Sequence, residues 1–357
     1  MPENISTPKV SPPPRIEWAD FAKGFTMLTV IFGHAAVYGQ EIFFKAGLIA
    51  VYEFHMPFFF VMAGFLLNFA KWGGTENFRP FVTKLFQRLL VPYYLAEILW
   101  YPIWFFAGHV MGHTAYIRNP ALSPENAFWG IFVGNGNLLA LVPLWFLPAL
   151  FIAEIIFILL HNRFAKLGDK IFVPIIVALS CSGYLIGQKI FLPMSFDVAL
   201  TVQIFILAGV LIRKYNLVEK ITLRRAFILL NIFALIFLLN GKISIASRDY
   251  GDLFFLCAGG IAGTLLVMKF SVLVTKVGGK ICALIKYCGR QSLLVMTLHL
   301  PVAFVIYDIA STKLNLPVET VRALPEIIFA ITLFGTLIPL WIAKRFGKLP
   351  VVKNFCA

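Results

Sequence analysis

The segment Asp20-Phe-Ala-Lys23-Gly-Phe-Thr-Met-Leu-Thr-Val-Ile-Phe-Gly-His34 is largely apolar, yet it carries three ionisable side chains. A helix advances about 100° per residue, so the eleven steps from Lys23 to His34 return to nearly the same face, roughly 16 Å further along. If the segment spans a bilayer, Lys23 lies near one interface and His34 lies well inside. Ionisable groups at membrane depth cost several kcal/mol and normally face a partner, a cavity or a reaction. The structural alternative is a cationic anchor plus a histidine that bonds to a neighbouring helix.

Composition assigns the chain to the integral membrane proteins. Of its 357 residues, 60% are hydrophobic and only 13% are charged, whereas a soluble protein of this length needs more polar surface to cover its core. We therefore expect an all-α polytopic membrane protein with about ten transmembrane helices. The corresponding apolar runs are 19–39, 47–69, 81–107, 141–160, 171–188, 197–212, 226–241, 252–270, 291–309 and 325–343.

The basic residues predict the orientation of these spans. The formal net charge of +14 does not indicate a nucleic-acid partner, because the basic residues are scattered between apolar runs. With ten spans, 24 of the 31 basic residues fall on the side of the two termini, which is therefore expected to be cytoplasmic. The other seven are Lys45, Arg118, Lys189, Lys242, Arg248, Lys313 and Arg322.

The ends of the chain and its cysteines carry no predicted site. Residues 1–14 are polar and proline-rich, which predicts a disordered cytoplasmic N-terminus with no cleaved signal peptide. Residues 15–345 are the expected transmembrane domain, and residues 346–357 are a cytoplasmic tail. The five cysteines form no CxxC pair, so neither a disulfide framework nor a metal site is expected.

Polar side chains recur in the outer halves of later spans. The second span carries Glu53 and His55 and runs antiparallel to the first, so both residues lie at about the depth of His34. A histidine near a carboxylate in a low-dielectric pocket is the usual arrangement of a general base. His299, roughly halfway across the ninth span, adds a third intramembrane histidine. These residues predict one polar cavity; the alternative for Glu53 is an ion pair at the interface.

Four other residues have both a functional and a structural explanation. Lys84 and Arg88 share one helical face at the cytoplasmic boundary. The excess of basic residues on that side explains Lys84, whereas Arg88 is followed by apolar residues and is suited to hold an anionic group. Trp145 and Asp197 begin the fourth and sixth spans at the outer face. An aromatic belt or an N-cap explains them as well as substrate binding does.

An ordered set of segments resembles the integral membrane acyltransferase type 3 family, and more closely its fucose 4-O-acetylase-like branch. The likeness extends over roughly residues 15–345. The matching segments are Arg15 before Ile16-Glu-Trp-Ala-Asp20, Lys23-X10-His34, Phe54-His-Met-Pro-Phe-Phe-Phe-Val-Met-Ala-Gly64, Arg88-Leu-Leu-Val-Pro-Tyr93, Leu144-Trp-Phe-Leu147, Phe196-Asp197 and Gly289-Arg-Gln-Ser-Leu-Leu-Val-Met-Thr-Leu-His299.

The resemblance implies an O-acetyltransferase of the bacterial cytoplasmic (inner) membrane. Such an enzyme moves an acetyl or other short acyl group from acetyl-CoA, a co-substrate rather than a tightly bound cofactor, to a hydroxyl of a sugar, cell-surface polysaccharide or lipid-linked acceptor. It also implies that His34 is catalytic and that Lys23 is essential. One departure stands out, since many members carry arginine where this chain has Leu85. Lys84 is the candidate replacement for that cation.

Each ionisable or aromatic residue named above has an expected role in acyl transfer. We expect His34 to act as general base and Glu53, in preference to Asp20, to orient it. Lys23 and Arg88 would bind the phosphates of acyl-CoA. The expected acceptor-binding residues are His55, Trp145, Asp197 and His299. A proton-coupled transporter remains the alternative, because intramembrane histidines and acids also form proton relays.

Overall fold

The computed structural model describes residues 15–134 and 136–356, so the expected disordered segment 1–14 lies outside it. The described part is built of helices, and its only β feature is an isolated bridge between Ser244 and Asp249. The all-α prediction is therefore confirmed. The main helices are α1 (Glu17–Ala36), α2 (Ile42–Leu66), α4 (Phe78–Leu85), α5 (Val91–Trp104), α6 (Pro124–Val133), α7 (Phe146–Phe164), α8 (Asp169–Gly187), α10 (Gln203–Lys214), α12 (Leu223–Asn240), α13 (Leu253–Val277), α14 (Lys280–Arg290), α15 (Ser292–Leu314) and α17 (Pro325–Phe346). Shorter helices are α3 (Phe69–Trp72), α9 (Phe196–Thr201), α11 (Leu217–Lys220), α16 (Val318–Ala323) and α18 (Pro350–Lys353).

Eight of the helical runs among the described residues are long and apolar enough to cross a membrane. A ninth arises if the pair 193–201 and 203–214, bent by 50°, counts as one broken span. These nine correspond to nine of the ten expected runs. The first expected run became α1, which has 20 residues but is less apolar because Asp20, Lys23 and His34 interrupt it. The chain is thus a multi-pass membrane protein.

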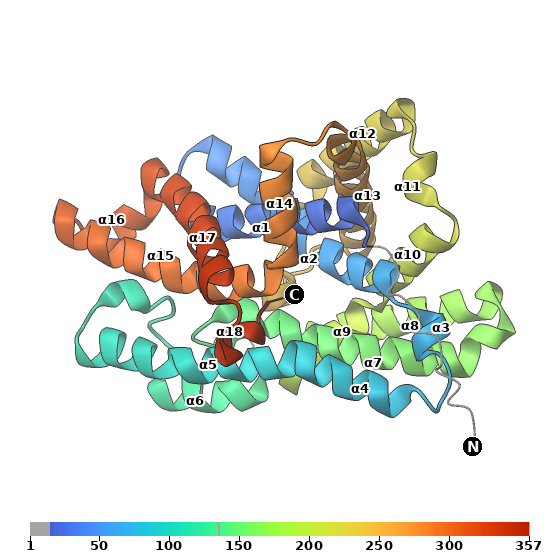
Figure 1. Cartoon of the computed structure of the whole chain (residues 1–357), viewed down its shortest axis with the longest axis horizontal. Coiled ribbons are helices and arrows are strands. Elements are labelled where there is room, and N and C mark those ends of the chain that lie inside the picture. The colour runs from blue at the N-terminus through green and yellow to red at the C-terminus, as the bar shows by residue number, and fades with distance from the viewer. Residues whose placement is uncertain (1–14, 135, 357) are drawn as a thin grey trace, which may run out of the picture.

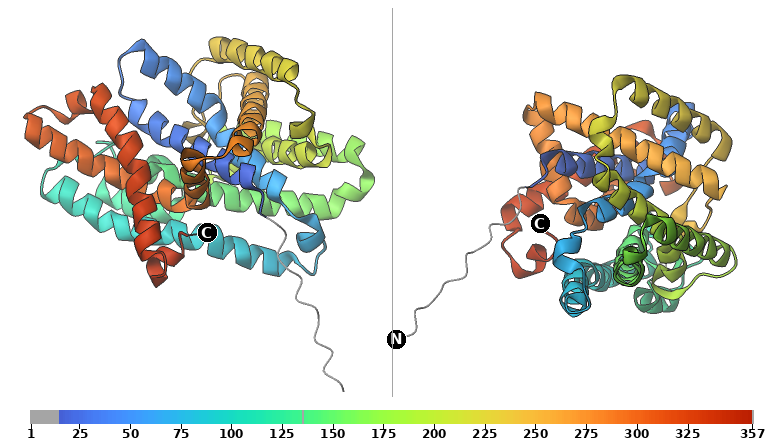
Figure 2. Two further views of the ribbon diagram at one scale, coloured as in Figure 1. Left: turned by 45° about the horizontal axis from the view of Figure 1, so that its top comes forward. Right: turned by 90° about the vertical axis from the view of Figure 1, so that its right-hand side faces the viewer.

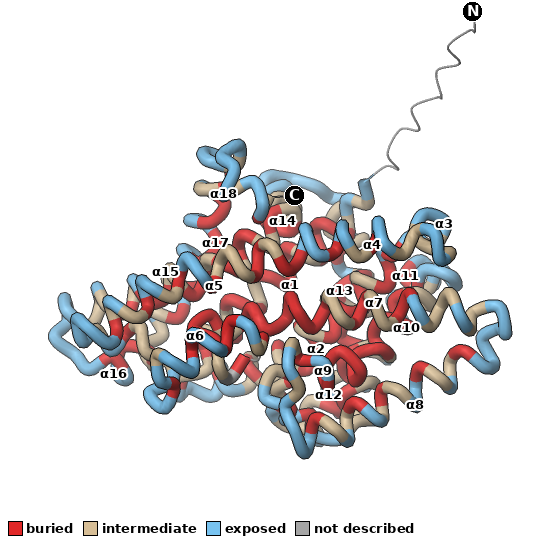
Figure 3. The backbone as a smooth tube through the Cα atoms, turned by 90° about the horizontal axis from the view of Figure 1, so that it is seen from below, coloured by how far each residue is buried: buried red, intermediate tan, exposed pale blue. Residues whose placement is uncertain are grey.

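Helix α1 lies at the centre of the molecule, and buried residues follow much of its length (Figure 3). It crosses α14 with the two backbones in contact. A methyl group at Gly24 would collide with the carbonyl oxygen of Ile285, and one at Gly289 would collide with that of Asp20. Small residues allow such close approach between helices in a membrane. This contact fixes the helix that carries Lys23 and His34.

The remaining helices surround this centre in two groups (Figure 1). Helices α4, α5 and α7 lie across one half of the molecule, where α7 packs against the segment that joins α4 to α5. Helices α15 and α17 pack together at one end of the other half (Figure 2). Helix α12 lies at the periphery, where Ile236 is its only buried residue. Its exposed apolar side chains suit a lipid-facing position.

The ends of the helices gather on two opposite faces. One face carries Lys23, Lys84, Arg88 and Arg290 together with the expected cytoplasmic tail, and we call it the basic face. The tail folds back on it, since Phe355 is buried after the short helix α18. The other face carries Arg118 and the loop 241–252. We call it the opposite face.

Candidate active site

Two histidines from distant segments stack inside the molecule. His34 lies in the last turn of α1 and His299 in α15, with ring centroids 5.4 Å apart and planes inclined by 24°. Nδ1 of His299 lies 3.1 Å from the carbonyl oxygen of Val295, which only an N–H can satisfy, so the neutral ring keeps its lone pair on Nε2. That Nε2 and Nδ1 of His34 are both buried without a hydrogen-bond partner among the described residues.

Helix α2 supplies the rest of this cluster. Nδ1 of His55 lies 2.8 Å from the carbonyl oxygen of Val51, which leaves its Nε2 as the acceptor in the neutral ring. The Tyr52 ring lies 4.9 Å from that of His55 and 6.4 Å from that of His34. His34, Tyr52 and His55 line a cavity of about 110 Å³, which we call the histidine cavity, whereas His299 lines a separate small void beside His34. The other lining residues of the histidine cavity include Met27, Phe59, Arg118, Trp145, Phe146, Ser244, Ser247 and Met296.

Glu53 does not belong to this cluster, contrary to the sequence-based expectation. It is fully buried, but it faces α12 and α13, where Asn240 Nδ2 donates to its Oε1 at 3.4 Å and Gly259 packs against it. Tyr52 and His55 are on the cavity-facing side of α2, and one residue turns the side chain by about 100°. Asp20 is held at the far end of α1 by Arg15. No carboxylate therefore orients His34 in the described part of the chain.

Asp197 was also expected in the acceptor site, and the structure places it elsewhere. It is fully buried and accepts hydrogen bonds from Arg248 Nε at 2.7 Å and Nη2 at 3.0 Å. The backbone N–H of Leu192 also donates to Asp197. Arg248 ends the segment whose Ser244 and Ser247 line the histidine cavity. Asp197 thus anchors a wall of the cavity from behind, whereas Trp145 lines it directly.

A cavity of about 820 Å³ lies on the basic face, and we call it the basic cavity. Lys23 lines it and pairs with Asp20 at 3.1 Å, and Arg88 lines it and pairs with the buried Glu154 at 2.6 Å. Pro92 explains the position of Arg88 in part. Because proline lacks the N–H that would bond to the carbonyl of residue 88, the helix widens into a π turn at residues 86–90.

Three further cations line the basic cavity, namely Lys71, Lys84 and Arg290. The ammonium groups of Lys71 and Lys84 lie 4.8 and 5.3 Å from the ring centre of Trp72, which also lines the cavity. Leu85, where the family resemblance leads one to expect arginine, lies on the same wall. Lys84, the residue before it, places a positive charge on the lining of the cavity.

The two cavities share an apolar wall, which we call the apolar constriction. Four side chains line both of them: Met27, Phe59, Phe146 and Met296. They come from α1, α2, α7 and α15, so every helix that supports the cluster contributes to the boundary. A path from the basic face to the histidines must pass between these side chains.

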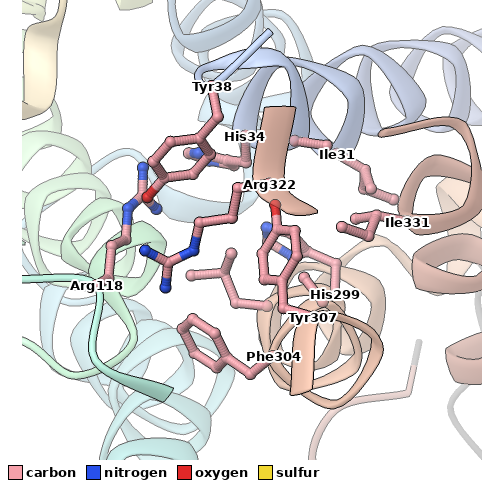
Figure 4. A pocket seen from close by; sticks show the side chains of 12 residues that line it. Ile31, His34, Tyr38, Arg118, His299, Phe304, Tyr307, Arg322 and Ile331 are labelled. Carbon is pink, nitrogen blue, oxygen red and sulfur yellow. The ribbon is translucent and has the colours of Figure 1, made fainter. Parts of the chain in front are cut away.

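From the sequence, Arg118 and Arg322 are expected only to contribute to the orientation of the chain in the membrane. In the structure both line a small void of about 10 Å³ together with His34, His299, Tyr38 and Tyr307. Figure 4 shows both side chains in this pocket, with the Arg118 guanidinium beside Tyr38. No motif pointed to them, because they lie in a loop and in the short helix α16 between spans.

One of three comparisons with known proteins matches nearly the whole chain. A family model described as an acyltransferase domain matches residues 16–344. No curated protein and no solved structure matches the chain. No group of three metal-binding side chains occurs in residues 15–134 and 136–356.

Proposed function

Since this chain belongs to the acyltransferase family whose model it matches, we propose that it transfers an acetyl or other short acyl group from acyl-CoA to a hydroxyl of a sugar, a cell-surface glycan or a lipid-linked acceptor. The observation that carries the proposal is the pair of neighbouring cavities, one lined by cations and the other by His34, that share four apolar side chains. The proposed location is the bacterial cytoplasmic membrane, with the basic face toward the cytoplasm.

The basic cavity suits the donor. Five cationic side chains line it, and among the described residues Glu154 is its only acidic lining residue. Glu154 pairs with Arg88, and Asp20 pairs with Lys23 and Arg290. This leaves positive charge for the phosphates of CoA, which lysine binds as a point charge and arginine as a planar fork. A volume of about 820 Å³ lies in the range of cavities that enclose small ligands. The acyl end of the donor would extend through the apolar constriction.

The histidine cavity suits the chemistry. A neutral His34 takes the proton of the acceptor hydroxyl while the hydroxyl oxygen attacks the thioester carbonyl carbon. The C–S bond then breaks, and the leaving thiolate takes up the proton. His299 and His55 are placed to hydrogen-bond to the acceptor or to the developing oxyanion. Because no carboxylate contacts His34, its ring would be held by packing against His299 and Tyr52.

The direct test measures covalent transfer. Membranes containing the protein, or the protein purified in nanodiscs, are incubated with acetyl-CoA labelled in the acetyl group. Label is then sought in glycan and lipid fractions. Label that appears with the wild type and disappears with His34→Ala, at equal protein level, supports the proposal. Substrate flux across vesicles without any covalent label would instead favour the transporter.

A further inference from the structure

Arg118 and Arg322 are cations that no carboxylate among the described residues neutralises. Within the described residues, neither guanidinium forms an ion pair, since Asp308, beside Tyr307 on α15, pairs with His113 instead at 2.8 Å. Arg322 is only 6% exposed, and its Nε is buried without a hydrogen-bond partner. Nη1 of Arg118 is buried and unpartnered as well. Arginine stays charged at any physiological pH, so burial without a counter-ion is costly.

The surroundings of Arg322 hold it in place without neutralising it. Its Nη2 donates to the carbonyl oxygens of Ala115 and Ile117 at 3.2 and 3.3 Å. Its guanidinium also lies 5.2 Å from the ring centre of Tyr38 and 5.4 Å from that of Tyr307. These contacts fix the segment that presents Arg118. The Arg322 guanidinium is therefore preorganised, and both arginines have N–H groups without a partner among the described residues.

The position of Arg118 connects this pair to the reaction centre. Arg118 lines the histidine cavity, the small void beside His299 and a third cavity of about 210 Å³ on the opposite face. The third cavity is lined by Trp104, Asn119, Leu122, Gly136, Leu139, Ala140 and Val142. A molecule that reaches His34 from the opposite face through this cavity must pass Arg118.

We propose that Arg118 forms an oxyanion-binding site at the opposite-face end of the histidine cavity, with Arg322 behind it in the adjoining small void, so that the acceptor carries a carboxylate or a phosphate near the hydroxyl that is acylated. The inference rests on the proposed function, because it assumes that an acceptor is acylated. Anion binding by the site can nevertheless be tested without turnover. A planar guanidinium can donate to two oxygens of a carboxylate or of a phosphate, whereas a neutral sugar would leave the charges of Arg118 and Arg322 uncompensated. The anion would also hold the hydroxyl in one orientation toward His34.

The binding test uses the purified full-length protein with inorganic phosphate as the probe. All samples contain saturating coenzyme A, which occupies the basic cavity. The thermal midpoint is compared in sodium phosphate and in sodium chloride of equal ionic strength. Phosphate should raise the midpoint of the wild type and of Lys189→Gln, an exposed cation of the opposite face that lines none of these cavities. The phosphate-dependent rise should fall by at least half in Arg118→Gln. An equal rise in all three proteins, or no rise in the wild type, would overturn the site.

The second test identifies the class of anion on the natural acceptor. Product labelled from acetyl-CoA in membranes is separated by anion exchange, before and after phosphatase treatment or carbodiimide-activated reduction of carboxylates. Loss of retention after phosphatase assigns a phosphate, and loss after reduction assigns a carboxylate. Incorporation should fall about tenfold in Arg118→Gln, as expected for one lost charge-assisted hydrogen bond, and stay unchanged in Lys189→Gln. A labelled but neutral product would overturn this inference alone, whereas no label at all would speak against acyl transfer itself.

Discussion

The rings of His34 and His299 stack at 5.4 Å although their helices are separated by most of the sequence. Each ring has one buried nitrogen that no described residue bonds to. Buried polar groups are normally satisfied, and exceptions in native structures call for an explanation. A reacting hydroxyl and a thioester carbonyl beside the two rings would supply partners for these nitrogens.

Replacing His34 by glutamine should therefore reduce acyl transfer by about 10²- to 10⁴-fold, the usual contribution of a general base. His299→Gln should have a smaller effect, and the double variant should lose less than the product of the two single losses, because the rings act on one reaction. Turnover of labelled acetyl-CoA checks this. His109→Gln, on an exposed histidine at the opposite face, is the matched control. Full independence of the two losses would contradict a shared site.

A bulky side chain at the constriction should block the path between the cavities. Met296→Trp is expected to reduce transfer by about tenfold or more, since overpacking between fixed helices is poorly tolerated. Binding of CoA to the basic cavity should persist, because the cations that line it are unchanged. Met296→Leu preserves volume and should remain active. Equal activity of the tryptophan variant would mean that the acyl group does not pass this point.

The buried ion pair of Asp197 and Arg248 should stabilise the wall of the histidine cavity. Asp197→Ala leaves the guanidinium buried and unpaired, which costs about 3–5 kcal/mol in comparable cases. Thermal unfolding in detergent measures the loss, and Asp249→Ala, at an exposed acidic neighbour, serves as control. Replacing Arg248 by methionine in the Asp197→Ala background should recover part of the stability. A fully stable Asp197→Ala protein would contradict this role.

The sequence predicted the helices well because membrane depth imposes length and apolarity on each span. Charge alternation also placed Lys23, Arg88 and Lys84 on one face, where the basic cavity lies. The first helix was the least apolar of the predicted spans because it carries Asp20, Lys23 and His34. Its burial comes from close contact with α14 through Gly24 and Gly289, a feature visible only in three dimensions.

The direction in which each polar side chain points could not be predicted from the sequence. The second span is apolar on all sides, so periodicity does not reveal which neighbour Glu53 faces. Its hydrogen bond to Asn240 depends on how α12 packs. The pairing of Asp197 with Arg248 likewise joins a helix start to a loop 51 positions later. Arg118 and Arg322 belong to connecting segments, where no helical period constrains position.

Lys84 offers the sharpest test of the donor side, because it lines the basic cavity one position before the leucine that replaces the expected arginine. Lys84→Gln should raise the KM for acyl-CoA several-fold and leave kcat nearly unchanged, since a phosphate contact far from the thioester contributes to binding in both ground and transition states. The difference in KM between Lys84→Gln and the wild type should shrink at high salt, because salt screens the attraction between Lys84 and the phosphates in the wild type.

Lys348→Gln removes an equal charge from an exposed position in the C-terminal tail and should leave KM unchanged. Arg88→Gln should be more damaging than Lys84→Gln, because it also leaves the buried Glu154 without its partner at 2.6 Å. Arg88→Gln combined with Glu154→Gln should restore stability but not donor affinity. That split would separate the two roles of Arg88, whereas restoration of both would mean that Arg88 serves only to neutralise Glu154.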